Sequence, residues 1–170
     1  RTLCGFEEGV EQIDWSKSWK GPVEVALLAA EIKAGRAIGA VEAMAIGANP
    51  ITPEGGAILL DTIKTSKLKT IDIGKPLHLQ EPYESDTLDL SNTKMDPGHV
   101  LLLSWWLTTD AGAAVARLIL DENPLTGGGR YGSDHDKDIT GVSALFDTLK
   151  TSSVTELGLA KCRLGPDSLG

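Results

Sequence analysis

The densest group of potential metal ligands lies in a glycine-rich stretch in the second half of the chain. Asp134, His135 and Asp136 follow one another there, with Asp138 close by. Carboxylates suit Ca²⁺, and a histidine with carboxylates suits Zn²⁺. The ordered Asp, Gly and distant Glu positions of an EF-hand loop are missing, however. A solvated acidic loop tip is the preferred interpretation, and whether Asp134, His135 and Asp136 hold a metal stays open.

Phosphate-binding and nucleophile motifs are incomplete as well. The glycines at 127–129 suggest a phosphate loop, but no Gly-Lys-Ser or Gly-Lys-Thr follows them. GxSxG and HExxH are missing, and neither Cys4 nor Cys162 has a recognisable partner signature. His78 and His99 lack ligand-spaced acidic or Cys neighbours, so each is interpreted as a surface or loop histidine. We therefore predict no catalytic residue, no metal ligand and no cofactor. An enzyme that uses the insertion is the weakest alternative.

The composition is typical of one folded domain. The chain has 170 residues, of which 41% are hydrophobic and 24% charged. Its net charge of -8 and the lack of a long basic run argue against nucleic acid as a partner. Two isolated cysteines favour a reducing compartment such as the cytoplasm. No apolar run approaches the ~20 residues of a membrane span, and no signal peptide is visible.

One hydrophobic pattern recurs along the chain. The segment 41–51 fits L-x-x-L-x-L-x-x-N-x-L, with any aliphatic residue at the L positions. Its alternating residues predict a short strand, and Asn49 predicts a buried amide bonded to main chain. The same frame fits 115–125 with Asn123, and 154–164 with Cys162 in the Asn position. Weaker copies begin near Leu88, Leu68 and Val10.

Proline pairs open the apolar stretches between these strands. Gly21-Pro22, Thr52-Pro53, Asp96-Pro97 and Gly165-Pro166 each stand at the start of a helical pattern. Thr52 and Asp96 are natural N-caps. A further helix is expected at about 139–151 without a proline. Strands therefore alternate with helices.

This spacing resembles the leucine-rich repeats of the ribonuclease-inhibitor-like type. The resemblance implies a single α/β domain over 1–170: a leucine-rich-repeat solenoid of five or six units, with parallel strands on the concave face and helices on the convex face. The unit at about 10–36 is degenerate. Two departures are expected, an irregular loop at about 76–86 in place of a helix and the glycine-rich insertion at about 127–138.

Small residues and acids dominate the outward positions of the predicted strands. Asp72, Asp89, Asp121 and Glu122 are the candidates for partner binding there. If this face binds, the partner is a protein with a basic or extended segment. A merely solvated face is the alternative.

Two adjacent tryptophans occupy positions that are small or polar in the other predicted helices. Trp105 and Trp106 cover the neighbouring unit that lacks a helix, or they anchor a partner on the convex side. If the indoles fill that gap, replacing them should lower stability, whereas loss of partner binding with an unchanged melting curve would support the anchor.

The sequence as a whole predicts a protein-interaction or scaffold module without catalytic activity. The alternative is an architectural subunit of a larger assembly. The chain begins without Met and stops within a predicted helix, so a longer parent chain is expected. Further repeats or a partner subunit should then cover the edge near Leu157 and Leu164.

Overall fold

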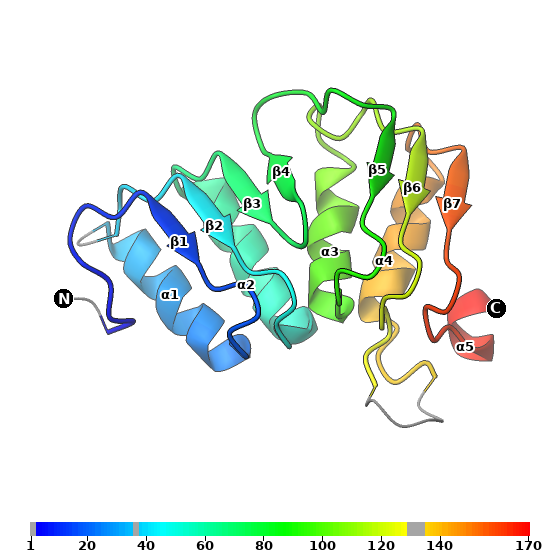
Figure 1. The fold of residues 1–170 in the computed structure, drawn as a ribbon, viewed down its shortest axis with the longest axis horizontal. Coiled ribbons are helices and arrows are strands. Elements are labelled where there is room, and N and C mark those ends of the chain that lie inside the picture. Colours follow the sequence, from blue (N-terminus) through cyan, green and yellow to red (C-terminus); the bar gives the residue numbers. More distant parts are fainter. Residues whose placement is uncertain (1–2, 36–37, 129–134) are drawn as a thin grey trace.

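Strands and helices alternate along the chain. The computed structural model describes residues 3–35, 38–128 and 135–170. The strands lie in one layer and the helices in a second, and the two ends of the chain lie at opposite ends of the molecule (Figure 1). In chain order the elements are β1 (Gln12–Asp14), α1 (Pro22–Ala34), β2 (Ala43–Ala45), α2 (Thr52–Thr65), β3 (Thr70–Asp72), β4 (Pro76–His78), β5 (Thr87–Asp89), α3 (Pro97–Trp106), β6 (Arg117–Ile119), α4 (Thr140–Leu149), β7 (Glu156–Gly158) and α5 (Pro166–Leu169).

The strands form two separate sheets, so the predicted solenoid with one parallel sheet is wrong. In the first sheet β1, β2 and β3 are parallel, and β4 pairs antiparallel with β3, with Leu77 opposite Ile71. The second sheet contains β5, β6 and β7, all parallel. A strand has two edges, and β4 occupies the edge of β3 that β5 would need to continue the sheet. The chain turns back at Gly74, whose φ of 129° favours glycine.

The predicted irregular loop at 76–86 is therefore partly regular, because its first residues form β4. The expected absence of a helix between β3 and β5 is confirmed within the described residues. The side chain of Trp106, from α3, fills the space that a helix between β3 and β5 would have occupied. This side chain is only 1% exposed, its Nε1 donates to the His78 carbonyl at 2.7 Å, and Tyr83 packs edge-on against its ring at 5.8 Å.

The helix layer remains continuous across the break between the sheets. α1 packs on α2, α2 on α3, and α3 on α4. Glycines allow the helices to approach closely at their amino ends. A Cβ atom at Gly98 would lie 2.1 Å from the Thr52 carbonyl oxygen, and one at Gly141 would lie 2.3 Å from the Pro97 carbonyl oxygen. Neither position accepts a larger residue unless a helix moves.

Capping is specific for α3 and differs from the prediction for α2. The Asp96 carboxylate accepts from the amides of Gly98 and His99, as expected for an N-cap. Thr52 makes no side-chain cap bond, and its own amide donates to Asp96 Oδ2 at 2.7 Å instead. One carboxylate thus caps α3 and ties it to the start of α2. None of the described helices is long and apolar enough to span a membrane.

Candidate binding surfaces

A buried polar slot lies in the turn after each of several strands. Asn49 is 3% exposed and fills the slot after β2. Its Nδ2 donates to the carbonyls of Trp15 and Ile46 at 2.6 and 2.7 Å, and its Oδ1 accepts from the amides of Ser18 and Lys20 at 3.1 and 3.0 Å. The predicted burial and main-chain bonding of Asn49 are confirmed. The amide joins its own turn to that of the preceding strand.

Asn123 repeats this arrangement after β6. It is 1% exposed, donates to the Leu90 and Leu120 carbonyls at 2.7 and 2.9 Å, and accepts from the Met95 amide at 3.0 Å. Cys162 has the same position after β7, where its thiol donates to the Leu120 carbonyl at 3.1 Å. The Asn or Cys position of the sequence pattern is therefore a structural link between turns.

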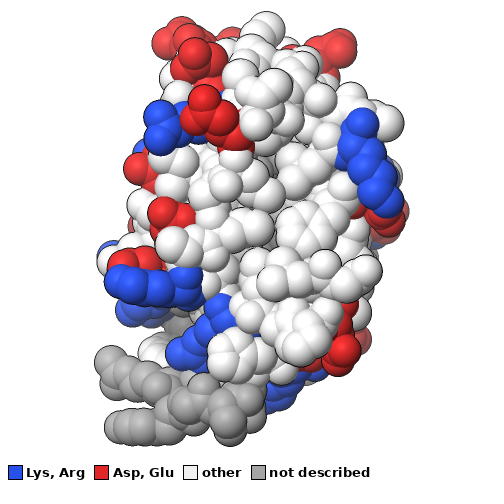
Figure 2. Space-filling view, turned by 90° about the vertical axis from the view of Figure 1, so that its right-hand side faces the viewer, with Lys and Arg blue, Asp and Glu red and all other residues white. Residues whose placement is uncertain are grey.

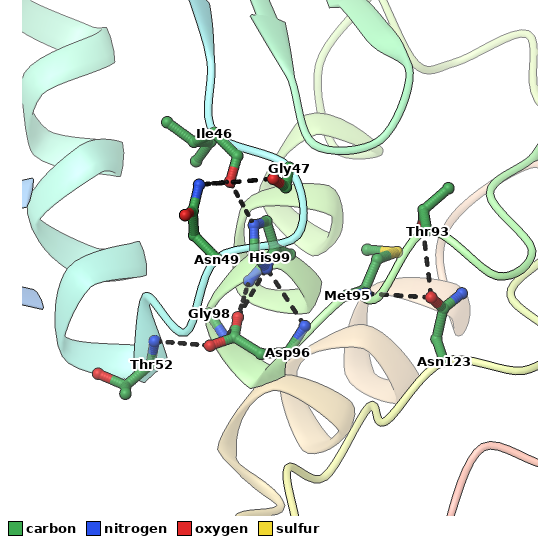
Figure 3. Close-up of polar contacts among 10 residues, drawn as sticks. All are labelled: Ile46, Gly47, Asn49, Thr52, Thr93, Met95, Asp96, Gly98, His99 and Asn123. Atoms are coloured by element: carbon green, nitrogen blue, oxygen red, sulfur yellow. Dashed lines mark hydrogen bonds and ion pairs between the residues drawn. The ribbon is translucent and has the colours of Figure 1, made fainter. Parts of the chain in front are cut away.

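A buried histidine adds a second link that the sequence analysis missed. His99 is fully buried, so its interpretation as a surface or loop residue is wrong. Its Nε2 lies 3.1 Å from the Ile46 carbonyl and its Nδ1 lies 2.7 Å from Asp96 Oδ1 (Figure 3). The Ile46 carbonyl accepts from both Asn49 and His99. The Asp96-x-x-His99 spacing, with His in the place that Glu takes in a capping box, was the signal for this role.

The residues on either side of the buried slot point outward and line an open groove. The groove has a volume of about 1030 Å³ and runs along the turns that lead from strands into helices. Several of these turn residues adopt positive φ, among them Lys17, Trp19, Ala48, Lys94, Glu122, Lys161 and Arg163. In these turns the residues before and after the buried one point outward. Turns that are far apart in the sequence therefore contribute side chains to one surface.

Basic side chains dominate the charge of this groove. Lys17, Lys94, Lys137, Lys161 and Arg163 line it, against the acids Asp96, Glu122 and Asp138. Lys161 pairs with Glu122 at 2.7 Å, and this contact raises the pKa of Lys161. Asp96 and Asp138 accept from main-chain amides at the starts of α3 and α4. Lys17, Lys94 and Lys137 make no ion pair with any residue that the structure describes.

The acidic residues predicted to bind a partner are engaged in local hydrogen bonds. Asp72 accepts from the Gly74 amide at 2.7 Å, Asp89 from the Ser91 amide at 2.9 Å and Asp121 from the Ala160 amide at 2.8 Å. Side-chain and main-chain bonds from Ser91 lower the pKa of Asp89. The carboxylates of Asp72 and Asp89 shape the turns that follow their own strands, and that of Asp121 joins its turn to the turn after β7. Their bonds give the acids a structural role that does not require a partner.

The two adjacent tryptophans differ in burial. Trp106 is inside the protein and offers no surface to a partner. Trp105 is half-buried and packs against the core. Of the two explanations from the sequence, covering the place of the missing helix fits the contacts of Trp106.

The end of the molecule formed by β7 is a different kind of surface. The central residue of the other parallel strands is 2% exposed or less, as for Met44, Leu88 and Leu118, whereas Leu157 in β7 is 36% exposed. Leu169 of α5 is 65% exposed. Half-buried apolar side chains surround them, from the segments that flank β7 (Val154, Leu159 and Leu164) and from α4 (Phe146 and Leu149). We call these residues the end face.

Figure 2 looks onto this end and shows a broad uncharged centre with acidic and basic side chains around its margin. The opposite end is covered by the chain itself. Cys4, Phe6 and Val10 pack there against the core, and the Phe6 ring lies 5.8 Å from that of Trp15. The two ends of the strand layer therefore differ: the amino-terminal segment packs over the β1 end, whereas Leu157 and Leu169 are exposed at the β7 end.

The predicted acidic loop tip lies partly outside the described residues, since Asp134 and positions 129–133 belong to the part that is not described. Among described residues no group of three His, Cys, Asp or Glu side chains is placed to hold a metal. Asp136 accepts from the amides of Gly165 and Asp167, both at 2.9 Å. Burial favours a higher pKa for Asp136, but hydrogen bonds from Ser168 and these amides lower it overall. Asp136 thus holds the start of α5.

Both cysteines are protected from ionising. Burial and then the Glu31 carboxylate raise the pKa of the Cys4 thiol to about 11, and burial raises that of Cys162. We expect iodoacetamide at pH 8 to alkylate the folded protein far more slowly than the unfolded chain, because the thiolate is the nucleophile. The folded pKa of Cys4 lies above its ordinary value of 9.0. The Cys4 contribution to stability should therefore be lost as pH rises from about 9 to about 11. Equal alkylation rates at pH 8, read by mass spectrometry, would contradict this prediction.

No protein-family model matches the chain, and no curated protein matches it significantly. The resemblance to leucine-rich-repeat proteins therefore stays a prediction. The function has to be argued from the surfaces themselves.

Proposed function

We propose that this protein is an interaction module whose end face binds a partner polypeptide. The observation that carries the proposal is the exposure of Leu157, at a strand position whose equivalents are buried in every other parallel strand. An aliphatic side chain that is open to solvent at the central position of β7, and buried at this position in the other described parallel strands, indicates a surface that another chain covers. A catalytic role has no supporting observation of this kind.

The end face combines two kinds of attraction. β7 pairs with β6 on one side only, so its other edge offers unpaired main-chain groups over Glu156–Gly158. Leu157 and Leu169 supply apolar area beside this edge. A partner that presents an extended strand flanked by apolar side chains would satisfy both. An uncharged centre with a charged margin is also the usual anatomy of a protein interface.

An architectural subunit of a larger assembly would use the same face. It differs from an interaction module in that its partner stays bound permanently. A permanent neighbour leaves the isolated protein prone to aggregation, whereas an exchangeable partner requires that it be soluble alone. The purified chain is expected to be monomeric in sedimentation experiments, in line with an exchangeable partner.

The acidic residues Asp72, Asp89 and Asp121 are a second candidate site, for a basic segment of another partner. The carboxylates of Asp72 and Asp89 accept turn amides, and the bonds from Ser91 lower the pKa of Asp89. This candidate is weaker, because those bonds already explain the acids.

Site-specific photocrosslinking tests the end face. A benzophenone amino acid is placed at Leu157 or at Leu169, and at Val23 of α1, 69% exposed, as a control. In native extract the two end-face positions are expected to crosslink to the same segment of one polypeptide, whereas position 23 does not. Crosslinks to another copy of this chain, or equal labelling from position 23, would refute the proposal. The substitution Leu157→Asp should abolish the shared crosslink from position 169 with little change in the melting curve, since Leu157 is already partly solvated.

A further inference from the structure

We propose that the groove along the strand-to-helix turns binds an extended acidic segment of a polypeptide. This site is separate from the end face, and neither proposal depends on the other. The groove residues alternate with the buried slot residues of the same turns. Glu122 and Pro124, for example, flank the buried Asn123, and Lys161 and Arg163 flank the buried Cys162.

The shape of the groove suits an extended chain. Its lining comes from the turns after β1, β2, β5, β6 and β7, which follow one another along the molecule (Figure 1). Neighbouring strands are about 4.8 Å apart, and an extended chain advances about 3.3 Å per residue. Because β3 and β4 lie between β2 and β5, the row of turns covers about six strand spacings, and a segment of about ten residues is long enough to pass over all five turns. Pro50, Pro53, Pro97 and Pro124 add a rigid apolar lining.

The charge of the groove is opposite to that of the protein as a whole. The chain carries a net charge of -8, yet five basic side chains face three acids in the groove. Asp96 and Asp138 are engaged at helix starts, and Glu122 pairs with Lys161. Lys17, Lys94 and Lys137 have no such pairing with described residues, so their charge is available to a ligand.

The pattern of charges favours carboxylates over a nucleic-acid backbone. Glu122, Asp96 and Asp138 interrupt the basic residues, and a continuous row of phosphates would meet these acids at close range. A peptide can place its acidic residues opposite the lysines and leave small residues opposite the acids. Trp19 adds an apolar contact at one end, because it lines the groove and is 87% exposed.

Fluorescence anisotropy with a labelled ten-residue peptide of alternating Glu and Ala tests the proposal. We expect the peptide to bind, and the double variant Lys17→Glu with Lys94→Glu to weaken binding by about tenfold or more. Glu122 occupies the turn position equivalent to Lys17 with φ 61°, so glutamate is compatible with the backbone at position 17. A melting curve checks that the variant folds.

The matched control is Lys64→Glu with Lys67→Glu, which changes the net charge equally at two exposed lysines outside the groove. It should change the affinity by less than about twofold. Equal losses in the two variants, no binding of the peptide, or equal binding of a Lys-Ala peptide would overturn the proposal. Tighter binding of single-stranded DNA at the same lysines would also overturn it. Crosslinking from Leu157 should be unaffected in the groove variant, which separates this test from that of the end face.

Discussion

Replacing Trp106 with threonine is expected to lower the free energy of unfolding by about 3–5 kcal/mol. The substitution removes the largest buried side chain of α3 and the only indole donor to the His78 carbonyl among the described residues. No neighbouring helix can close the space, because β4 and the following loop run through the place where a helix would lie. Chemical denaturation followed by circular dichroism measures the change. Since small domains are stable by only ~5–15 kcal/mol, the loss should be obvious.

Two companion variants make this result specific. Trp105→Thr, next to it and half-buried, should cost about 1 kcal/mol or less. Trp106→Phe keeps an aromatic ring against Tyr83 but loses Nε1 and part of the buried ring, so it should cost roughly 1–3 kcal/mol. Hydrogen exchange of the Leu79 amide, which donates to the Lys69 carbonyl at 2.8 Å, should accelerate when Trp106 is lost. Equal, small losses for Trp105→Thr and Trp106→Thr would contradict the proposed role.

The substitution Asn123→Leu should be almost as damaging, at about 3 kcal/mol or more. It leaves the carbonyls of Leu90 and Leu120 and the amide of Met95 without the partner that Asn123 provides, and each lies where water has little access. A buried polar group that loses its partner costs ~1–3 kcal/mol. The melting temperature should fall accordingly.

Asn123→Cys provides the matched variant, because Cys162 fills the equivalent slot and donates to the Leu120 carbonyl. A thiol restores a donor but no amide oxygen, so the loss should lie between those of the wild type and the leucine variant. Glu122→Gln, at the exposed neighbouring position, should have little effect. An unchanged melting temperature in Asn123→Leu would contradict the assignment of this slot.

The local features of this protein follow from its sequence alone. The short strands, the helix starts at proline, the cap by Asp96 and the buried amides of Asn49 and Asn123 were predictable. Each depends on contacts within one strand, one turn or the neighbouring turn, and residue spacing encodes such contacts directly. The missing helix between β3 and β5 was also predictable, since the chain between them is too short.

The arrangement of these parts was decided by the tertiary structure. β4 and β5 compete for one edge of β3, and the sequence pattern does not say which strand wins; the nearer one does, since it needs only a tight turn at Gly74. That choice splits the sheet and buries Trp106. His99 is buried only because Ile46, far away in the sequence, supplies an acceptor. The basic groove arises in the same way. Lys17, Lys94 and Lys161 belong to separate turns and become one surface only when the turns stack.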